Sequence, residues 1–282
     1  MKTLLCCIGR KENRYIREFV EYYKKIGFTH ICLYDNNYEG EEHFEDVIGD
    51  YVDGGFVEII DYRGKQTCQV RAYNDCYERF GDAYDWIAFF DCDEFLTFSD
   101  GAGETIDEAL SWSGYDGYDS VFVNWLVYGD GGMLTDDGRP VLERFTERLT
   151  FNPDREKNEM CRNDVIKIIV RGGLPEAKFA STHSLLTKLN CCNDIGEKVS
   201  YKCGMHEYNY DRMYIRHYQC KTIEEFLWKV SRGYADQPNR TDDYFVRIRG
   251  MFFNHNKVTR EKLQYIKDKI GLDLFKYYPD AL

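Results

Sequence analysis

The sequence predicts an α/β fold in which a mostly parallel central sheet is flanked by helices and followed by a helical C-terminal extension. Short apolar segments rich in strand-forming residues occur at 3–8, 30–34 and 56–62. Between them, segments 15–26 and 44–52 carry apolar residues at helical spacing, regularly in the first and weakly in the second. Strands that alternate with helices are typical of parallel sheets.

The rest of the chain continues this alternation and then changes to helices alone. Apolar periodicity and strand composition predict helix 66–80, a strand from Trp86, helix 106–112, strands 119–127, 165–170 and 214–218, and helices 222–233, 242–253 and 259–270. Thr222 and Glu225 form a capping-box pattern at the start of the first C-terminal helix. No element is predicted within 173–213. We expect one main domain at 1–220, with a helical extension at 221–282 packed on it.

The composition argues against several classes of protein. The net charge is −12, and we expect no nucleic acid as partner, because phosphate backbones are held by clustered Lys and Arg. No segment approaches the roughly 20 apolar residues of a membrane span, and the apolar start is too short for a signal peptide. The 11 cysteines form no Cys-x-x-Cys pair, so we expect reduced, mostly buried thiols. We expect a cytoplasmic protein with at most peripheral association at the inner face of a membrane.

The strand from Trp86 ends in a cluster of acids, Asp91-Cys92-Asp93-Glu94. Carboxylates this close repel one another unless positive charge lies between them. Oxygen ligands at the end of a buried strand suit Mg²⁺ or Mn²⁺ that also holds a phosphate. A bare Asp-x-Asp is more often an ordinary polar turn. The interpretation as a metal site therefore depends on the surrounding sequence.

Polar residues follow the other predicted strands in the same way. Arg10 and Glu12 follow the first strand, and Asp35 and Asn36 follow the second. Ligands of open parallel sheets bind beyond the carboxyl ends of the strands, so these residues are expected at one edge with the acid cluster. No G-x-G-x-x-G follows the first strand and no P-loop motif occurs, which excludes a Rossmann dinucleotide site and a P-loop site.

Four of these stretches, in this order, resemble the GT-A glycosyltransferases related to families 2 and 92. They are residues 10–19, 27–36, 69–76 and 85–95. The usual opening of this family is Arg-Asn-Glu or Lys-Asn-Glu, and Lys11 departs from it. A looser resemblance continues through segments 123–125, 143–146 and 215–218 to Gly233.

The resemblance implies a nucleotide-sugar donor, usually a uridine diphosphate sugar, held with Mn²⁺ or Mg²⁺ by the Asp-x-Asp motif. Such a cation would neutralise the charge that develops on the departing diphosphate. By resemblance Asp93 is a direct metal ligand, and Asp91 is a second ligand or a contact to the ribose and a metal-bound water. Glu94 would orient these groups. His217, from the late strand, would bind the metal or the diphosphate, although a lone strand histidine is more often structural.

The resemblance also suggests which residues surround the nucleotide. By similar position, Asp35 and Asn36 would contact the uridine or ribose, and Arg10 and Glu12 would line the same base pocket. Gln69, Arg71 and Asn74 lie close enough on one predicted helix to face the donor. Lys221 and Arg232 are candidate partners of the diphosphate, because an acidic protein must supply positive charge locally. Ordinary loop and helix-surface polarity is the alternative explanation for each.

Inverting transfer needs a general base that deprotonates the acceptor hydroxyl. Asp130, in a glycine-rich turn, and Glu143 are the candidates, and the sequence does not choose between them. Two carboxylates could also serve glycoside hydrolysis, but adjacent acids at a strand end suit a metal better than that geometry.

We therefore expect a metal-dependent, inverting glycosyltransferase that acts in polysaccharide or glycan assembly, with a glycan or lipid-linked saccharide as acceptor. One alternative is a sugar-phosphate nucleotidyltransferase, which would normally show a glycine-rich, basic N-terminal loop. The other is a non-catalytic module that binds nucleotide sugars or glycans. The presence of Asp91, Asp93 and His217 together argues against a decayed site.

Overall fold

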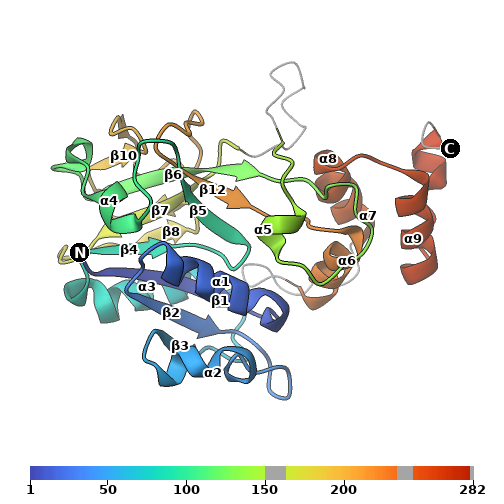
Figure 1. Cartoon of the computed structure of the whole chain (residues 1–282), viewed down its shortest axis with the longest axis horizontal. Coiled ribbons are helices and arrows are strands. Elements are labelled where there is room, and N and C mark those ends of the chain that lie inside the picture. Colours follow the sequence, from blue (N-terminus) through green and yellow to red (C-terminus); the bar gives the residue numbers. More distant parts are fainter. Residues whose placement is uncertain (150–162, 234–243, 280–282) are drawn as a thin grey trace. The chain divides into compact units, whose positions relative to one another are not determined.

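The computed structural model describes residues 1–149, 163–233 and 244–279. Within these, the chain forms two compact units (Figure 1). The first comprises 1–126 and 163–217, and the second comprises 127–149, 218–233 and 244–279. The division at residue 220 that the sequence suggests stays a prediction.

The first unit contains the parallel strands that the sequence predicts. They are β1 (Thr3–Gly9), β2 (His30–Asp35), β3 (Val57–Asp61) and β4 (Trp86–Phe89), and they lie in the order β4-β1-β2-β3. Helices α1 (Asn13–Lys25), α2 (Glu45–Asp53) and α3 (Gln69–Phe80) connect them (Figure 1). Gly9 pairs with Asp35, which pairs with Asp61, so three carboxyl ends lie level at one edge. This confirms the α/β fold class.

The sheet continues beyond β4 with strands of mixed direction. They are β6 (Ser120–Val127), β7 (Ile166–Arg171), β10 (Cys191–Asn193) and β11 (Lys198–Val199), in the order β11-β10-β6-β7-β4. Strand β7 is antiparallel to both β4 and β6, whereas β10 is parallel to β6. Strands β8 (Phe179–Ser181) and β9 (Ser184–Leu185) form a separate pair. The unassigned segment 173–213 therefore contains four short strands in addition to the start of β12.

The acid cluster separates two strands. Strand β5 (Glu94–Phe98) begins at the third acid, and β12 (Met213–His217) pairs with it in antiparallel fashion and also pairs with β6. The sequence pattern does not predict β5 as a strand of its own. Short helical segments complete the unit: η1 (Gly81–Ala83), α4 (Ile106–Leu110) and η2 (Ser113–Tyr115).

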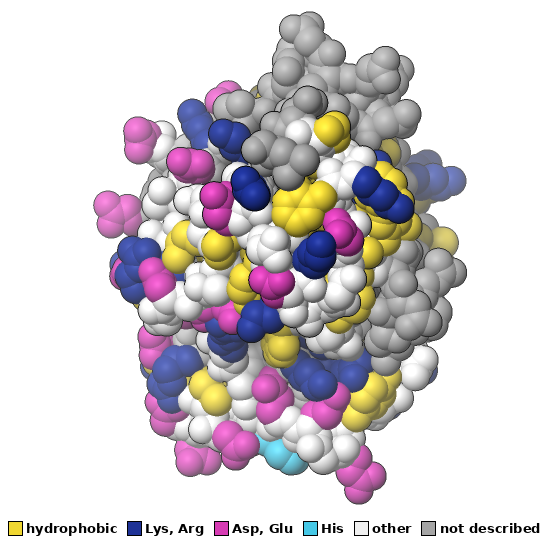
Figure 2. Space-filling view, turned by 90° about the vertical axis from the view of Figure 1, so that its right-hand side faces the viewer, with side chains coloured by type: hydrophobic (Ala, Val, Ile, Leu, Met, Phe, Trp, Pro, Cys, Tyr) yellow, Lys and Arg dark blue, Asp and Glu magenta, His cyan; other side chains and the backbone are white. Residues whose placement is uncertain are grey.

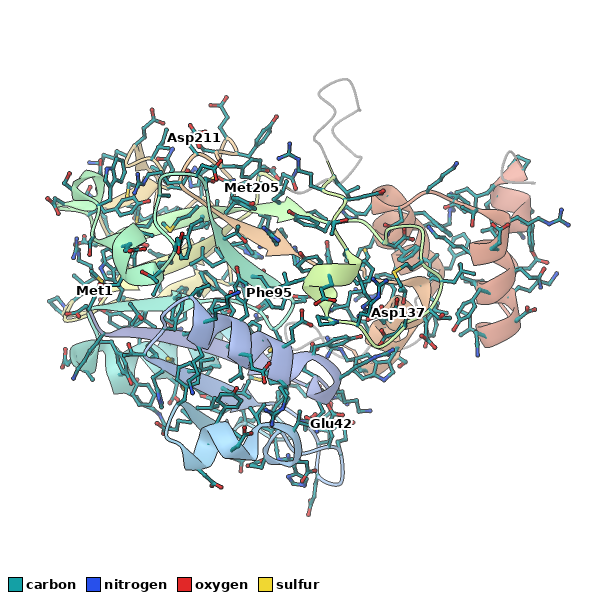
Figure 3. The ribbon with its side chains drawn as sticks, in the orientation of Figure 1. Met1, Glu42, Phe95, Asp137, Met205 and Asp211 are labelled. Carbon is teal, nitrogen blue, oxygen red and sulfur yellow. The ribbon has the colours of Figure 1, made fainter. Side chains whose placement is uncertain are left out.

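Helix α1 holds β5 in place. Its apolar face is buried, and the ring of Phe19 lies 5.9 Å from the ring of Phe95, the β5 residue labelled in Figure 3. The fully buried Tyr23 donates a hydrogen bond to the carbonyl of Glu94 at 2.8 Å and accepts one from the backbone N–H of Leu96 at 3.1 Å. These bonds satisfy backbone groups of β5 directly after the acid cluster.

The second unit is mainly helical, as predicted for the end of the chain. Its elements are α5 (Val141–Arg144), α6 (Ile223–Arg232), α7 (Tyr244–Arg247), the π-helical turn η3 (Ile248–Phe252), α8 (Phe253–His255), α9 (Arg260–Ile270) and η4 (Phe275–Tyr277). Thr222 and Glu225 form the expected capping box at the start of α6. Apolar side chains of α6, η3 and α9 pack into one core cluster.

The surface shows charges of both signs, and the cysteines are mostly buried. On the face drawn in Figure 2, Lys and Arg side chains lie interspersed with Asp and Glu. Of the ten cysteines in the described ranges, nine are buried and Cys203 is exposed, and all ten are free thiols. Within the same ranges, no helix combines the length and apolar character needed to cross a membrane.

A buried ion pair links α5 to α6 in the second unit. Arg144 donates two hydrogen bonds to the carboxylate of Glu225, both at 2.9 Å, and each side chain is 1% exposed. Burial by itself would raise the pKa of Glu225, but the hydrogen bonds from Arg144 and the charge of Lys221 outweigh burial and lower this pKa to about 2.

This pair predicts a specific acid sensitivity. Because the pKa of Glu225 falls from 4.5 to about 2 on folding, its stabilisation is present above pH 4.5 and is lost as the pH falls toward 2. Glu225→Gln should lower the free energy of unfolding by roughly 3 kcal/mol at pH 7. In urea denaturation, the difference from wild type should shrink between pH 4.5 and pH 3. Glu147→Gln, at an exposed position of the same unit, is the control; an equal pH response in both variants would contradict the prediction.

Candidate active site at the carboxyl edge of the sheet

The acid turn, residues 90–93, connects β4 to β5 and is fixed to the end of β1. The backbone N–H of Phe90 donates to the carbonyl of Cys6 at 3.1 Å, and the thiol of Cys92 donates to the carbonyl of Ile8 at 3.6 Å. The backbone N–H of Asp91 donates to the carboxylate of Glu94 at 2.9 Å. The parallel pairing of β1 with β4 therefore brings these acids to the sheet edge, as predicted.

A buried lysine of β7 supplies positive charge to this turn. The Nζ of Lys167 lies 3.0 Å from Oδ1 of Asp91 and 3.5 Å from Oε2 of Glu94. The same Oδ1 accepts hydrogen bonds from Gln69 Nε2 at 2.5 Å and from the hydroxyl of Tyr73 at 3.0 Å. Burial alone would raise the pKa of Asp91, but the charge of Lys167 outweighs burial and lowers this pKa.

Lys167 is the main residue that the sequence interpretation misses. The crowded carboxylates indicate a cation, and the structure places an ammonium group beside two of them. One signal was available: Lys167 interrupts an otherwise apolar predicted strand, Ile166-Lys167-Ile168-Ile169-Val170. A lysine within such a strand needs a buried partner.

Glu94 lies behind the turn. Its side chain is fully buried, and burial raises the pKa of Glu94 well above its usual value despite the nearby charge of Lys167. Its carboxylate accepts the hydrogen bond from the backbone of Asp91. Its role in orienting the metal ligands stays a prediction.

Asp93 and His217 form the second part of the candidate site. Because β12 runs antiparallel to β5, His217 pairs with Glu94 and stands beside the acid turn. Its Nε2 lies 3.7 Å from Oδ1 of Asp93, and both side chains are at most 9% exposed. The ring of Trp125 lies with its centroid 4.0 Å from that of His217 and 5.1 Å from that of His183. Aromatic packing thus fixes the imidazole of His217.

These groups fit part of a divalent-metal site. In the parts of the chain that the structure describes, no group of three or more His, Cys, Asp and Glu side chains gathers into a metal site. Asp93 and His217 offer an oxygen and a nitrogen 3.7 Å apart. Mg²⁺ is usually bound by one or two carboxylates together with substrate phosphates and water. The donor set therefore suits a cation whose remaining ligands come from a diphosphate.

The residues after β1 contact the loop after β2. The guanidinium of Arg10 donates to both carboxylate oxygens of Glu41, at 3.2 and 3.1 Å, and lies 3.8 Å from the ring centroid of Tyr38. Burial would raise the pKa of Glu41, but the hydrogen bond from Arg10 lowers it to about 2. Glu12 is buried, and its carbonyl accepts the first helical hydrogen bond of α1, from Ile16.

Asp35 is the last residue of β2 and Asn36 follows it, and both are buried. Asp35 pairs with the guanidinium of Arg63 at 2.5 Å. The amide of Asn36 donates to the carbonyls of Tyr62 and Lys65, at 2.9 and 2.7 Å. Both side chains therefore fix the loops at this edge, and their contacts to a nucleotide stay predictions.

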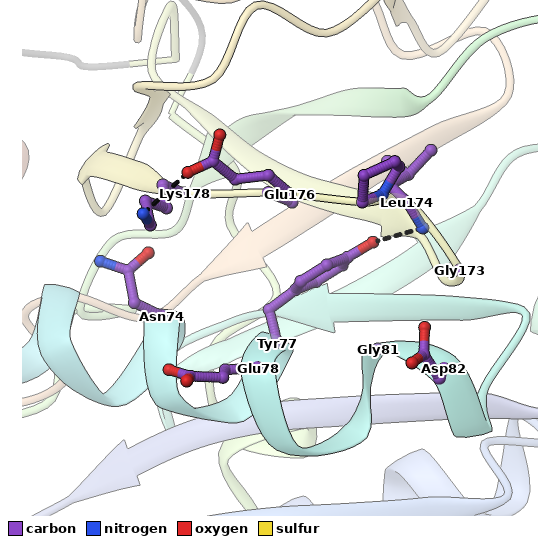
Figure 4. A pocket seen from close by; sticks show the side chains of 11 residues that line it. Asn74, Tyr77, Glu78, Gly81, Asp82, Gly173, Leu174, Glu176 and Lys178 are labelled. Carbon is purple, nitrogen blue, oxygen red and sulfur yellow. Dashed lines mark hydrogen bonds and ion pairs between the residues drawn. The ribbon is translucent and has the colours of Figure 1, made fainter.

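The three candidate residues on α3 have different surroundings. Gln69, at the first position of the helix, reaches the acid turn, whereas Arg71 is exposed. The amide oxygen of Asn74 accepts a hydrogen bond from the backbone of Phe179 at 2.8 Å. Asn74 also lines a cavity of about 730 Å³ together with Tyr77 and the loop 173–178 (Figure 4). The structure thus brings Gln69, but not Asn74, into contact with Asp91.

Asp130, Glu143, Lys221 and Arg232 belong to the second unit. The buried carboxylate of Asp130 forms an ion pair with Lys262 and accepts a hydrogen bond from the backbone of Gly132 at 2.9 Å. Glu143 is exposed on α5, and Lys221 is buried with a left-handed backbone, φ 55°. Their catalytic and diphosphate roles stay predictions.

Comparison with known proteins identifies the family. The model of glycosyltransferase family 92 matches residues 2–243, so the chain belongs to this family. Family 92 proteins of Ricinus communis and Oryza sativa subsp. japonica are 25% and 27% identical to it over 156 residues, which is 55% of this chain. The chain spans about a quarter of the length of these relatives, 27% and 26%.

Among solved structures, TarS 1–349 of S. aureus in complex with UDP-GlcNAc is similar with a TM-score of 0.42 and 11% sequence identity. The match covers all of this chain and 80% of that structure.

Gly9 is predicted to be essential for the shape of the edge. A Cβ atom at this position would lie 2.9 Å from Cζ of the fully buried Phe44 and 3.3 Å from Sγ of Cys92. Gly9→Ala should therefore cost about 1–3 kcal/mol of unfolding free energy in urea denaturation, since the buried ring must shift. Gly49→Ala, within α2 and with no atom within 4 Å of the added Cβ, is the control and should not lower stability, because alanine favours a helix more than glycine does. Equal stability of both variants would contradict the expected clash.

Proposed function

We propose that this glycosyltransferase transfers a sugar from a uridine diphosphate sugar to a hydroxyl acceptor in a metal-dependent, inverting reaction. The observation that carries the proposal is the pair of Asp93 and His217 beside Asp91 at the carboxyl edge of the sheet. Ligands of open α/β sheets bind at this edge. Family membership supplies the reaction class, and the geometry supports the assignment of residues.

Asp93 and His217 would hold Mn²⁺ or Mg²⁺ together with oxygens of the diphosphate. When bound, the cation supplies charge stabilisation to the departing nucleoside diphosphate. Asp91 has one oxygen engaged by Lys167, Gln69 and Tyr73, which supports a contact to the nucleotide more than full participation in the metal shell.

Arg10, Glu12, Asp35 and Asn36 are proposed to form the wall of the nucleoside pocket. Arg10 and Asp35 already have ion-pair partners in Glu41 and Arg63. They would therefore act mainly by fixing the shape of the loops and by offering backbone groups to the base and ribose. Gln69 would stand at the inner end of this pocket, beside Asp91. Asn74 and Lys221 are proposed as further contacts to the donor. For Asn74, the alternative is the structural role of its hydrogen bond with Phe179.

The general base is proposed to be Asp130 or Glu143. Asp130 would have to exchange its ion pair with Lys262 for the acceptor hydroxyl, whereas Glu143 is exposed and needs no such exchange. This difference favours Glu143. A product with retained anomeric configuration, measured by NMR, would remove the need for either residue.

The acceptor is proposed to be a glycan or a lipid-linked saccharide, which the enzyme would bind in the cytoplasm or at the inner face of a membrane.

The alternative functions are a sugar-phosphate nucleotidyltransferase and a binding module without catalysis. The first would form a nucleotide sugar from a nucleoside triphosphate, and the second would bind a nucleotide sugar without consuming it. Product analysis distinguishes both from transfer.

The proposal predicts metal-dependent binding of a nucleotide sugar that requires Asp93. A panel of nucleotide sugars is screened by thermal unfolding and by release of the nucleoside diphosphate, with Mn²⁺ and with EDTA. We expect Tm to rise with a UDP sugar only when Mn²⁺ is present. Asp93→Ala should abolish this rise and reduce turnover at least ~100-fold, because it removes a metal ligand.

Asp61→Ala is the matched control, since Asp61 is an exposed aspartate at the end of β3 on the same edge. It should retain binding and turnover. The proposed function is wrong if no nucleotide sugar binds in a metal-dependent way, or if Asp93→Ala binds as tightly as wild type.

A further inference from the structure

Burying a charged lysine inside a β-sheet costs free energy, because the ammonium group loses its water. Lys167 is completely buried on β7, between Ile166 and Ile168, which are also completely buried. Removing an ammonium group from water costs several kcal/mol, and an apolar pair of similar volume is often at least as stable as a buried ion pair. Stability alone therefore does not explain why the chain places a lysine here.

The contacts of Asp91 converge on one of its carboxylate oxygens. Lys167 Nζ approaches Oδ1 from the sheet, while Gln69 and Tyr73 approach the same Oδ1 from α3. The hydroxyl of Tyr73 also lies 3.2 Å from Lys167 Nζ, which ties the two supports together. In the described part of the chain, the side-chain hydrogen bonds and ion pairs of this carboxylate all involve Oδ1. Oδ2 is therefore the oxygen that a ligand can use.

The exposure of the pair is asymmetric. The side chain of Asp91 is 30% exposed, whereas that of Lys167 is 0% exposed. The carboxylate thus faces the ligand side and its counter-charge lies entirely within the protein. Lys167 can act on a ligand only through Asp91. By offsetting the charge of this carboxylate, it reduces the repulsion between Asp91 and an anionic diphosphate.

We infer that Lys167 is a positioning residue for the nucleotide-sugar donor: it fixes Asp91 through Oδ1, directs Oδ2 toward the donor, and offsets the carboxylate charge without touching the donor. The inference rests on the proposed function. It assigns to Lys167 a role in donor affinity that is separate from its contribution to folding.

A double-mutant cycle tests the inference. Lys167→Met, Asp91→Asn and the double variant are compared with wild type for the Kd of the UDP sugar that wild type binds, for kcat, and for Tm. Each single variant should weaken donor binding roughly 10–100-fold, as losses of groups that orient a ligand contact do. In the double variant, donor binding should equal that of Asp91→Asn within about threefold, because Lys167 acts only through Asp91.

Stability should behave in the opposite way. Lys167→Met leaves Asp91 without its counter-charge, and Asp91→Asn leaves the buried Lys167 with Glu94 as its remaining carboxylate, so Tm should fall in both. The double variant removes both charges, so its Tm should recover toward wild type while donor binding stays weak. Recovery of stability without recovery of binding separates positioning from a purely structural role.

Three results would overturn the inference. If the fold-loss of donor binding in the double variant equals the product of the two single fold-losses, Lys167 acts independently of Asp91. Donor affinity of Lys167→Met within threefold of wild type, or donor affinity that recovers together with Tm, would reduce Lys167 to a structural residue. Lys178→Met, which removes an exposed lysine paired with Glu176, is the control and should change neither quantity. If Lys167→Met does not fold, Lys167→Gln takes its place in the same cycle.

Failure of the proposed function gives a different result. A wild-type protein that binds no nucleotide sugar refutes the proposed function, and the inference with it. A wild-type protein that binds the donor, together with a cycle of independent effects, refutes the inference alone.

Discussion

The ion pair between Lys167 and Asp91 joins the parts of the fold that meet at the candidate site. Lys167 comes from β7, an antiparallel strand of the sheet, and Asp91 follows β4, the last of the four parallel strands. Tyr73 adds the third component from α3 and contacts both charged groups. The position of Asp91 thus depends on sheet register and helix packing together, and any shift between them disturbs the turn.

Local pattern was enough to predict the parallel strands and the residues at their ends. Asp35, Asp91 and Asp93 lie at the expected edge because apolar runs of four to seven residues have clear ends. Strands of two or three residues, such as β9 at Ser184–Leu185, form only because tertiary pairing selects them, so the sequence gives little local signal for them. The helical C-terminal region was predictable for the opposite reason, since apolar positions recur along α6 and α9.

The partners of buried charges were not predictable in this way. Lys167 lies 76 positions after Asp91, and Lys262 lies far along the chain from Asp130. No helical or strand period connects such residues, because the fold alone determines the pairing. Asp130 illustrates the consequence: a glycine-rich turn with an acid resembles a ligand-binding loop, yet its carboxylate is engaged by a lysine of α9. A polar residue in an apolar strand is the local sign that such a partner exists.

Lys167 also bears on how the proposed metal site would work. Structural zinc sites often depend on the ion for folding, because the free energy of metal binding is what stabilises the folded state. Here Asp91 has a counter-ion that is covalently part of the chain, so the acid turn does not need a metal in order to form. Any cation held by Asp93 and His217 could therefore enter with one diphosphate and leave with the next, and the polypeptide would keep its shape through each exchange.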